Sequence, residues 1–327
     1  MPPMTAAPKL PGSPRPELAA RLDEAVHAVG QVLLGHDDVV RIALAALVGR
    51  GHILFEDVPG VGKTTLARAL ARVLGVSFAR VQFTADMLPS DVLGVQVLDP
   101  AAGELRFRHG PIFAELVLAD EINRASPKTQ SAMLEAMAER RVTVDDQSHE
   151  LASVFTVIAT QNPLEHHGAY PLPESQLDRF MVRLSLGYPP EAAELALVQR
   201  PRAPEAVLQS LPKLIDAAGL AAVQAAADEV LIAEPVARYL IALVQATRVH
   251  ADVVVGGSPR ASMAFATLAR AWALVHGRTF VLPDDVRFLA PSVLAHRLVV
   301  AGSSGAPARD AARAVIDDAL ARVPVPR

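Results

Sequence analysis

The 327-residue sequence contains no cysteine, which excludes disulfide bonds and metal sites built on thiolates. It has no apolar run near the ~18 residues that a membrane span needs, although 51% of its residues are apolar. The net charge is −4 and no basic run is present, which disfavours a surface that coats nucleic acid. No signal peptide is visible in the proline-rich start of the chain, and we expect a cytoplasmic protein.

The first part of the chain is predicted to hold a disordered tail and an α/β core. Residues 1–18 include six prolines and form the predicted tail. Residues 19–188 have the pattern of the core, with a short helix and hairpin inserted at 84–111 and a second hairpin at 141–154. Such insertions are usually interaction surfaces, and passive decoration is the alternative.

Two adjacent prolines, Pro189 and Pro190, mark the boundary to a region whose pattern is helical. We predict linker helices over residues 189–230 and a helical domain over 231–327. Within this domain a helical stretch is expected from Pro283 to about residue 298, broken at Pro291 because proline removes a helix hydrogen bond.

Residues 53–66 have the pattern of a phosphate-binding loop, in which an apolar strand, a turn with two glycines and an amphipathic helix follow one another. Gly60 and Gly62 allow backbone N–H groups to point at a polyphosphate. Lys63 supplies a charge for the β- and γ-phosphates, and the Thr64 hydroxyl can ligate Mg²⁺. The residues expected to bind the nucleotide are Pro59, Gly60, Val61, Gly62, Lys63, Thr64, Thr65 and, from a later strand, Asp120.

One position departs from the full motif, because Asp57 stands where the motif has glycine. An ordinary strand–turn–helix junction is therefore the alternative interpretation, and the motifs downstream favour nucleotide binding. Residues 33–36 lie just ahead of the loop and are candidates for the adenine pocket, although plain helix packing explains them equally well.

A second strand ends in two acidic residues. The apolar residues 116–119 are typical of a central parallel strand, and Asp120 and Glu121 follow them. Carboxylates in this position lie where doubly wound sheets bind their ligands. Asp120 can hold Mg²⁺ through water, and Glu121 can orient and deprotonate the attacking water. A solvated acidic loop is the weaker alternative.

Asn162 closes another predicted core strand, over residues 155–160. Its amide can position the lytic water beside the γ-phosphate, whereas a turn-forming asparagine before proline is the structural alternative. Further along the chain, a short helix over residues 176–180 is predicted to precede a strand over 181–186, with Arg179 near the end of that helix.

Five segments in this order resemble the MoxR group of AAA+ ATPases, and the resemblance covers about residues 30–296. Of these segments, the stretch from Asp120 to Ala125 is particularly diagnostic. The segments are Val58–Thr64, Ala119–Ala125, Ala159–Pro163, Leu172–Phe180 and Ser258–Arg260.

The resemblance implies an α/β core with a five-stranded parallel sheet of order 5-1-4-3-2, and an all-helical C-terminal lid. It implies ATP and Mg²⁺ as cofactors and a ring oligomer, expected to be a hexamer. Asn162 is implied as sensor 1, Arg179 as the arginine finger that reaches the neighbour's nucleotide, and Arg260 as sensor 2 on the lid. The two insertions correspond to the family's helix-2 insert and pre-sensor hairpin. Without the resemblance, Arg179 is most simply a surface arginine at a helix end.

The expected function is that of a chaperone-like ATPase that remodels a client protein complex during its maturation or during cofactor or metal insertion. A von Willebrand factor A-domain protein is the expected partner, because members of the family often act with one. The alternative is the ATPase subunit of a metal chelatase-like complex. A nucleic-acid remodeller is disfavoured by the acidic net charge. A scaffold without turnover is disfavoured by Asp120, Glu121 and Arg179.

Overall fold

The computed structural model of the chain describes residues 16–100, 103–145, 147–162, 169–199, 204–302 and 306–326. A parallel sheet of five strands, ordered β2-β5-β8-β1-β9, lies at the centre of the fold. When these strands are numbered by their order along the chain, the sheet order is 5-1-4-3-2, which confirms the prediction. The strands are β1 (Ile53–Glu56), β2 (Phe78–Gln82), β5 (Leu116–Asp120), β8 (Thr156–Gln161) and β9 (Val182–Leu184).

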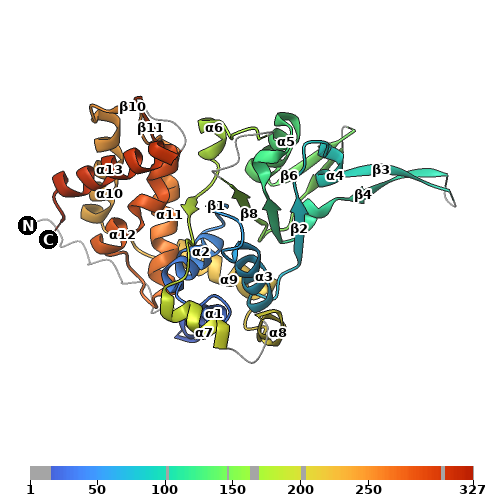
Figure 1. Ribbon diagram of the computed structural model, residues 1–327, viewed down its shortest axis with the longest axis horizontal. Coiled ribbons are helices and arrows are strands. Elements are labelled where there is room, and N and C mark those ends of the chain that lie inside the picture. The colour runs from blue at the N-terminus through green and yellow to red at the C-terminus, as the bar shows by residue number, and fades with distance from the viewer. Residues whose placement is uncertain are drawn as a thin grey trace, which may run out of the picture.

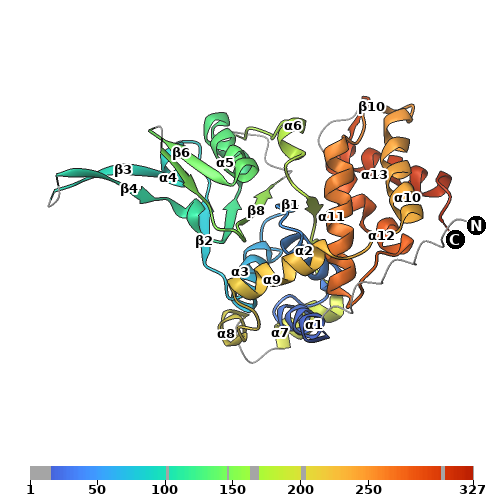
Figure 2. The same cartoon turned by 180° about the vertical axis from the view of Figure 1, so that it is seen from behind.

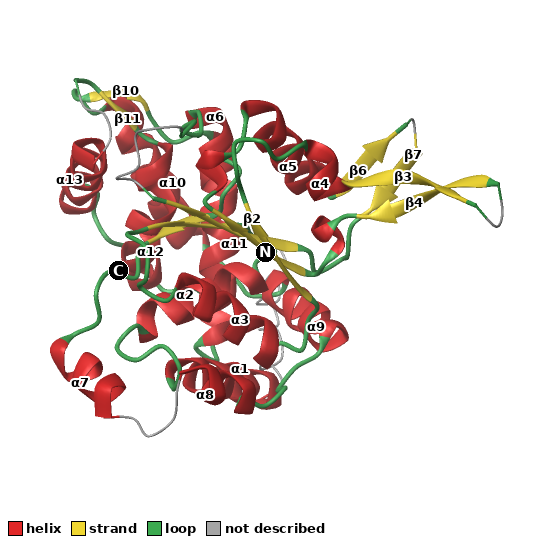
Figure 3. Cartoon of the chain, turned by 45° about the vertical axis from the view of Figure 1, so that its right-hand side comes forward, coloured by secondary structure: helices red, strands yellow, loops and turns green. Residues whose placement is uncertain are grey.

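The middle strands β1, β5 and β8 are buried along almost their whole length, because helices cover both faces of the sheet (Figures 1 and 3). The edge strand β2 is only partly buried. In the register of the sheet, Gln82 lies opposite Asp120 and Glu56 lies opposite Gln161. The polar C-terminal ends of four parallel strands therefore lie side by side, which is where parallel α/β folds bind ligands.

One face of the sheet shares an apolar core with helices from both ends of the chain, and in this core α11 (Pro259–Val275) of the lid packs on α2 and α9. Two short helices, α7 and α8, connect the core to α9. The helices on this side and in the linker are α1 (Pro16–Gly30), α2 (Asp37–Val48), α3 (Lys63–Val73), α7 (Glu191–Gln199), α8 (Pro204–Ser210) and α9 (Ala217–Asp228).

Both predicted insertions are hairpins on the other side of the core. The first consists of α4 (Pro89–Leu93), β3 (Gly94–Asp99) and β4 (Glu104–His109), and its ribbon projects from the body of the molecule (Figures 1 and 2). The second, β6 (Arg141–Val144) and β7 (Gln147–Glu150), follows α5 (Pro127–Glu139). Phe107 of the first stacks on His149 of the second, with ring centroids 4.0 Å apart, so the two insertions touch.

The lid is helical, as predicted, and it also carries a short antiparallel ribbon. The ribbon pairs β10 (Val253–Val255) with β11 (Val299–Val300). In the part of the chain that the structure describes, no helix is both long enough and apolar enough to cross a membrane. The lid helices are α10 (Glu234–Val249), α11 (Pro259–Val275), α12 (Pro283–Leu294) and α13 (Ala306–Arg322). Single 3₁₀ turns occur in the core at η1 (Pro111–Phe113) and η2 (Ile122–Arg124), and in the lid at η3 (Ala295–Arg297).

Three expectations about helices differ from the structure. Helix α1 begins at Pro16, so residues 16–18 of the predicted tail are helical, while residues 1–15 lie outside the described residues. The helix expected over 176–180 is α6 (Glu174–Leu177), which starts earlier because the Pro173 carbonyl accepts its first hydrogen bonds. The helix α12 continues through Pro291 and ends one turn later, at Leu294. Pro291 therefore does not break it, and the Pro291 carbonyl accepts a hydrogen bond from the amide of residue 295.

Candidate nucleotide-binding site

The predicted phosphate loop joins β1 to α3 through two glycines in the left-handed region, Gly60 (φ 88°) and Gly62 (φ 104°). Gly62 caps the start of α3, and a Cβ at this position would lie 2.9 Å from the Leu33 side chain. The loop thus curls around the positive end of a helix, which is the backbone geometry that binds phosphate. Leu33 of the predicted adenine pocket lies against it, and the role of residues 33–36 stays a prediction.

Lys63 is the first residue of α3, and its Nζ donates to the carbonyls of Asp57 (2.8 Å) and Val58 (2.9 Å). Burial lowers the pKa of the Lys63 ammonium, and the nearby carboxylates of Asp57, Asp120 and Glu121 oppose that shift. The lysine therefore lies inside the loop and near the carboxylate of Asp120, which the sequence predicts to hold Mg²⁺.

Asp57, the residue that departs from the motif, has a structural role. Its buried carboxylate accepts hydrogen bonds from Ser185 Oγ (3.0 Å), from the Leu186 amide and from the Gly187 amide (3.2 Å). These residues follow β9 and lead to the linker helices. A glycine could not make these bonds, so the aspartate ties the phosphate loop to the segment that connects core and lid.

We expect Asp57→Gly, which would restore the full motif, to destabilise the core. Each lost hydrogen bond to a charged group is worth about 1.5–3 kcal/mol, and the melting temperature should fall by about 5–10 °C. Asp57→Asn should have a smaller effect, because the amide keeps one acceptor. Calorimetry checks this against Asp38→Asn, an exposed carboxylate of α2 whose loss should change little. Equal melting temperatures for Asp57→Gly and Asp38→Asn would show that the Asp57 bonds do not hold the loop.

A pocket of about 340 Å³ lies between the phosphate loop and the ends of β2, β5 and β8. It brings together all the predicted nucleotide-binding residues except Val61, and it includes the predicted catalytic residues Glu121 and Asn162. Four further residues were not predicted from the sequence. The lining residues are Pro59, Gly60, Gly62, Lys63, Thr64, Thr65, Arg80, Gln82, Asp120, Glu121, Thr160, Gln161 and Asn162.

The two acidic residues are held by a chain of side-chain contacts. Asp120 Oδ1 accepts from Thr160 Oγ1 at 2.6 Å, and Asp120 Oδ2 accepts from Arg80 Nη2 at 2.7 Å. Glu121 has a left-handed backbone (φ 57°), which is uncommon for a residue with a side chain and typical of functional sites. Its Oε2 accepts from Gln82 Nε2 at 2.8 Å and from Arg124 Nη1 at 3.0 Å.

Arg80 and Gln82 carry a sequence signal that was missed. They lie two residues apart on β2, so both side chains project from the same face of the sheet beside β5. Polar residues that alternate along an edge strand normally face solvent, so the sequence pattern alone does not single out these two residues.

The comparison with known proteins agrees with this geometry. The chain matches the ATPase family associated with various cellular activities (AAA) over residues 52–182 and the AAA lid domain over residues 245–319. It is 46% identical over 284 residues to the uncharacterized protein YeaC of Bacillus subtilis, covering 87% of this chain and 88% of that protein. A crystal structure of a candidate ATPase from Cytophaga hutchinsonii, 33% identical, matches with a TM-score of 0.83 over 95% of this chain and 96% of that chain. The chaperone MoxR1 of Mycobacterium tuberculosis is 39% identical over 290 residues, covering 85% of this chain and 76% of MoxR1. This chain belongs to the MoxR family of AAA+ ATPases.

In this MoxR-family chain, the two predicted arginines, Arg179 and Arg260, do not line the pocket of the phosphate loop. They lie together in a second pocket of about 270 Å³ between core and lid, which Arg50, Arg140 and Arg297 also line. Burial lowers the pKa of His52 in this pocket to about 4, so the ring is neutral near pH 7 and the arginines supply the positive charge.

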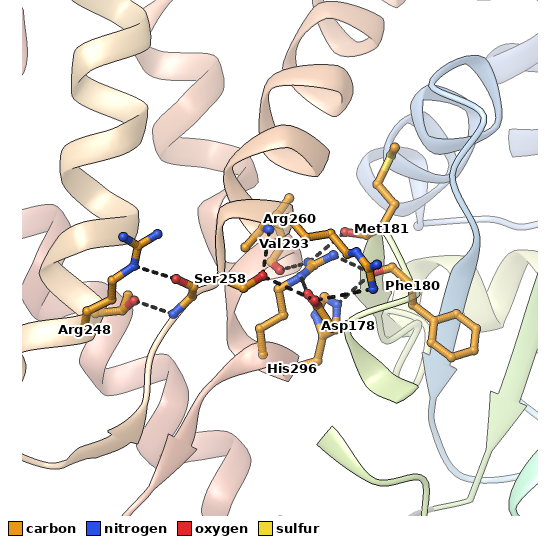
Figure 4. Close-up of polar contacts among 12 residues, drawn as sticks. Asp178, Phe180, Met181, Arg248, Ser258, Arg260, Val293 and His296 are labelled. Atoms are coloured by element: carbon orange, nitrogen blue, oxygen red, sulfur yellow. Dashed lines mark hydrogen bonds and ion pairs between the residues drawn. The ribbon is translucent and has the colours of Figure 1, made fainter. Parts of the chain in front are cut away.

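Asp178 orients this arginine group. Its carboxylate accepts from Arg297 Nε at 2.8 Å and from Ser258 Oγ at 3.3 Å, and it lies 4.0 Å from Arg260 Nη1. Figure 4 shows Ser258 and Arg260, at the start of α11, converging on Asp178 at the end of α6. The buried Arg297 also donates to the Phe180 and Met181 carbonyls, so this MoxR-family lid is anchored directly to the core.

The two arginines differ in their freedom. Arg179 donates from Nη1 to the Leu134 carbonyl at 2.7 Å, and its buried Nε has no hydrogen-bond partner among the described residues. Arg260 is 64% exposed in its side chain, and among the described residues its ion pair is the long contact to Asp178. The guanidinium of Arg260 is therefore open to solvent, whereas the unused Nε donor of Arg179 is buried between core and lid.

The residues of the first pocket fit a Mg²⁺–nucleotide. The curled loop and the start of α3 supply backbone N–H donors, and Lys63 supplies the cation that a polyphosphate requires. The Thr64 hydroxyl and the Asp120 carboxylate are oxygen ligands of the kind that Mg²⁺ prefers.

Proposed function

We propose that this chain hydrolyses ATP in a ring of identical subunits, expected to be a hexamer, and that the cycle remodels a client protein. The proposal rests on one observation. The pocket gathers Lys63, Thr64, Asp120, Glu121 and Asn162, which come from three separate segments of the chain, around a loop shaped for phosphate. In phosphoryl transfer most of the catalysis comes from such positioning and from charge stabilisation.

The proposed roles follow from where these groups lie. Lys63 binds the β- and γ-phosphates, and Thr64 and Asp120 hold Mg²⁺, Asp120 through water. When bound, Mg²⁺ neutralises charge on the phosphate oxygens. Glu121 takes the proton of the attacking water, and its carboxylate is kept in place by Gln82 and Arg124. Asn162 orients the water from the end of β8.

The arginines are proposed to act across the subunit boundary. Arg179 and Arg260 lie in a pocket of their own with unused donors, and the phosphate-loop pocket contains neither. In a ring, the second pocket of one subunit would face the nucleotide of the next, so that Arg179 serves as the finger and Arg260 as sensor 2. Hydrolysis would then require assembly.

The insertions are proposed to contact the client or a von Willebrand factor A-domain partner in the cytoplasm. On the projecting ribbon, Leu98 and Leu105 pair across the strands and are 59% and 67% exposed. Exposed apolar side chains on a projecting element are typical of an interaction surface. The similarity to a relative named as a chaperone favours this role over that of a chelatase subunit.

The test compares wild type with a chain in which residues 98–105 are replaced by a short Gly/Ser turn. Phosphate release from ATP should depend on Mg²⁺ in both proteins, and the shortened chain should keep basal turnover within about twofold because the ribbon lies outside the pocket. Leu98→Ser/Leu105→Ser is the milder matched variant. Absence of release in the wild type contradicts the ATPase. Loss of release only in the shortened chain, with assembly intact, would place the ribbon in the active site.

A further inference from the structure

Arg80 is a pocket residue to which the proposed reaction gives no role. Apart from Lys63, it is the one cationic side chain among the described residues that line the pocket. It lies on β2, at the edge of the sheet, and its side chain is 49% exposed. An arginine with one side open to a phosphate pocket is chemically suited to bind an anion there.

The contacts of Arg80 leave one edge of its guanidinium unused. Nε and Nη2 donate to Asp120 Oδ2 at 3.1 and 2.7 Å, and Nη2 also donates to Gln82 Oε1 at 2.9 Å. Nη1 has no hydrogen-bond partner among the described residues. Because a guanidinium presents five donors in a planar fork, Arg80 can hold Asp120 with one edge and offer the other to a ligand.

The position of Arg80 favours the terminal phosphate of a nucleotide as its ligand. Its guanidinium donates to Asp120, which with Thr64 would hold Mg²⁺, and a bound Mg²⁺ would lie beside the terminal phosphates of the nucleotide. The base end of the site is expected on the opposite side, where Leu33 lies against Gly62. On these two expectations, Arg80 would lie at the γ-phosphate end of the pocket, where ATP differs from ADP.

We propose that Arg80 contacts the terminal phosphate of ATP bound to its own subunit, and that it exchanges Asp120 for this phosphate when Mg²⁺ enters. The inference rests on the proposed ATP site. Asp120 has a cation beside it in both states, first the guanidinium and then the metal, so no buried carboxylate is left unpaired. Gln82 accepts from Arg80 and donates to Glu121, so the exchange is passed on to the proposed base. Arg80 thereby makes the site distinguish ATP from ADP.

Calorimetric titration of the full chain with ADP and with the non-hydrolysable analogue AMP-PNP, both with Mg²⁺, tests this. In Arg80→Ala the affinity for AMP-PNP should fall about 10- to 100-fold, the range of one charge-assisted contact, while the affinity for ADP stays within about threefold. Equal losses for the two nucleotides would make Arg80 a structural partner of Asp120 and overturn the inference. Unchanged affinity for both would overturn it as well.

A second variant covers the case in which Arg80→Ala does not fold. Arg80→Lys keeps a cation beside Asp120 but not the planar fork, so AMP-PNP affinity should fall about 3- to 10-fold, with ADP binding unchanged. Arg41→Ala removes a comparable arginine–carboxylate pair, with Asp23, away from the pocket, and should alter neither affinity.

Lys63→Ala separates the two proposals. If Lys63→Ala binds both nucleotides as wild type does, the proposed ATP site is wrong. If Lys63→Ala does not bind, but Arg80→Ala weakens both nucleotides equally, only the Arg80 inference is contradicted.

Discussion

Alanine in place of Lys63 is expected to abolish ATP binding, weakening it by at least about 100-fold, because the charge-assisted hydrogen bonds to the β- and γ-phosphates are lost. Glu121→Gln is expected to bind ATP as wild type does and to lose turnover by about 10²–10⁴, the usual contribution of a general base. The amide keeps the size of the side chain and an acceptor for Gln82 and Arg124, so the pocket is preserved. The pair of variants thus separates binding from chemistry.

The measurements are anisotropy with a fluorescent ATP analogue and phosphate release. Lys128→Ala and Glu135→Gln are matched controls, since both residues are exposed on α5 and line neither pocket. Each control should behave as wild type in both assays. Equal loss of binding in Lys63→Ala and Glu121→Gln would contradict the division of roles, because it would make Glu121 part of the nucleotide-binding surface.

The parts of this site that the sequence predicted are those in which function follows from neighbouring residues. The loop from Pro59 to Thr65 and the pair Asp120–Glu121 are local patterns, and parallel strands bring their ends together by geometry alone. The order of the sheet came from the resemblance to a family. Those predictions could therefore be made without knowing which residues far apart in the chain touch.

The parts that could not be predicted depend on distant partners. Asp57 stands where the phosphate-loop motif has glycine, so from the sequence it weakens the motif. Its carboxylate accepts hydrogen bonds from residues 185–187, which lie far along the chain, at the end of the core domain. Arg80 was indistinguishable from a solvent-facing residue of an edge strand until Asp120 was placed beside it. The ribbon β10-β11 joins two valine segments too short to show a strand period, so only the packing of the lid reveals it.

The proposed partner of Arg179 is the nucleotide of a neighbouring subunit, and on that proposal we expect Arg179→Ala to bind ATP normally and to turn over poorly. Arginine fingers are generally worth about 10³–10⁵ in rate, because they stabilise charge on the transferring phosphate. Within the subunit, Arg179 donates to the Leu134 carbonyl and lies in the pocket between core and lid, away from the phosphate loop. Turnover per wild-type subunit should therefore rise with protein concentration as rings form. Arg238→Ala, an exposed arginine paired with Glu234, is the control and should keep wild-type turnover.

Mixing Arg179→Ala with Lys63→Ala gives the decisive measurement. Each variant should be inactive alone, but in a mixed ring the first would supply an intact pocket and the second would supply the arginine. Part of the wild-type turnover should return, in proportion to the interfaces that pair the two. Native mass spectrometry establishes that mixed rings form, and circular dichroism establishes that loss of the Leu134 contact leaves α5 folded. If mixed rings of folded subunits recover no activity, Arg179 does not act on a neighbour and is a structural arginine that holds α5.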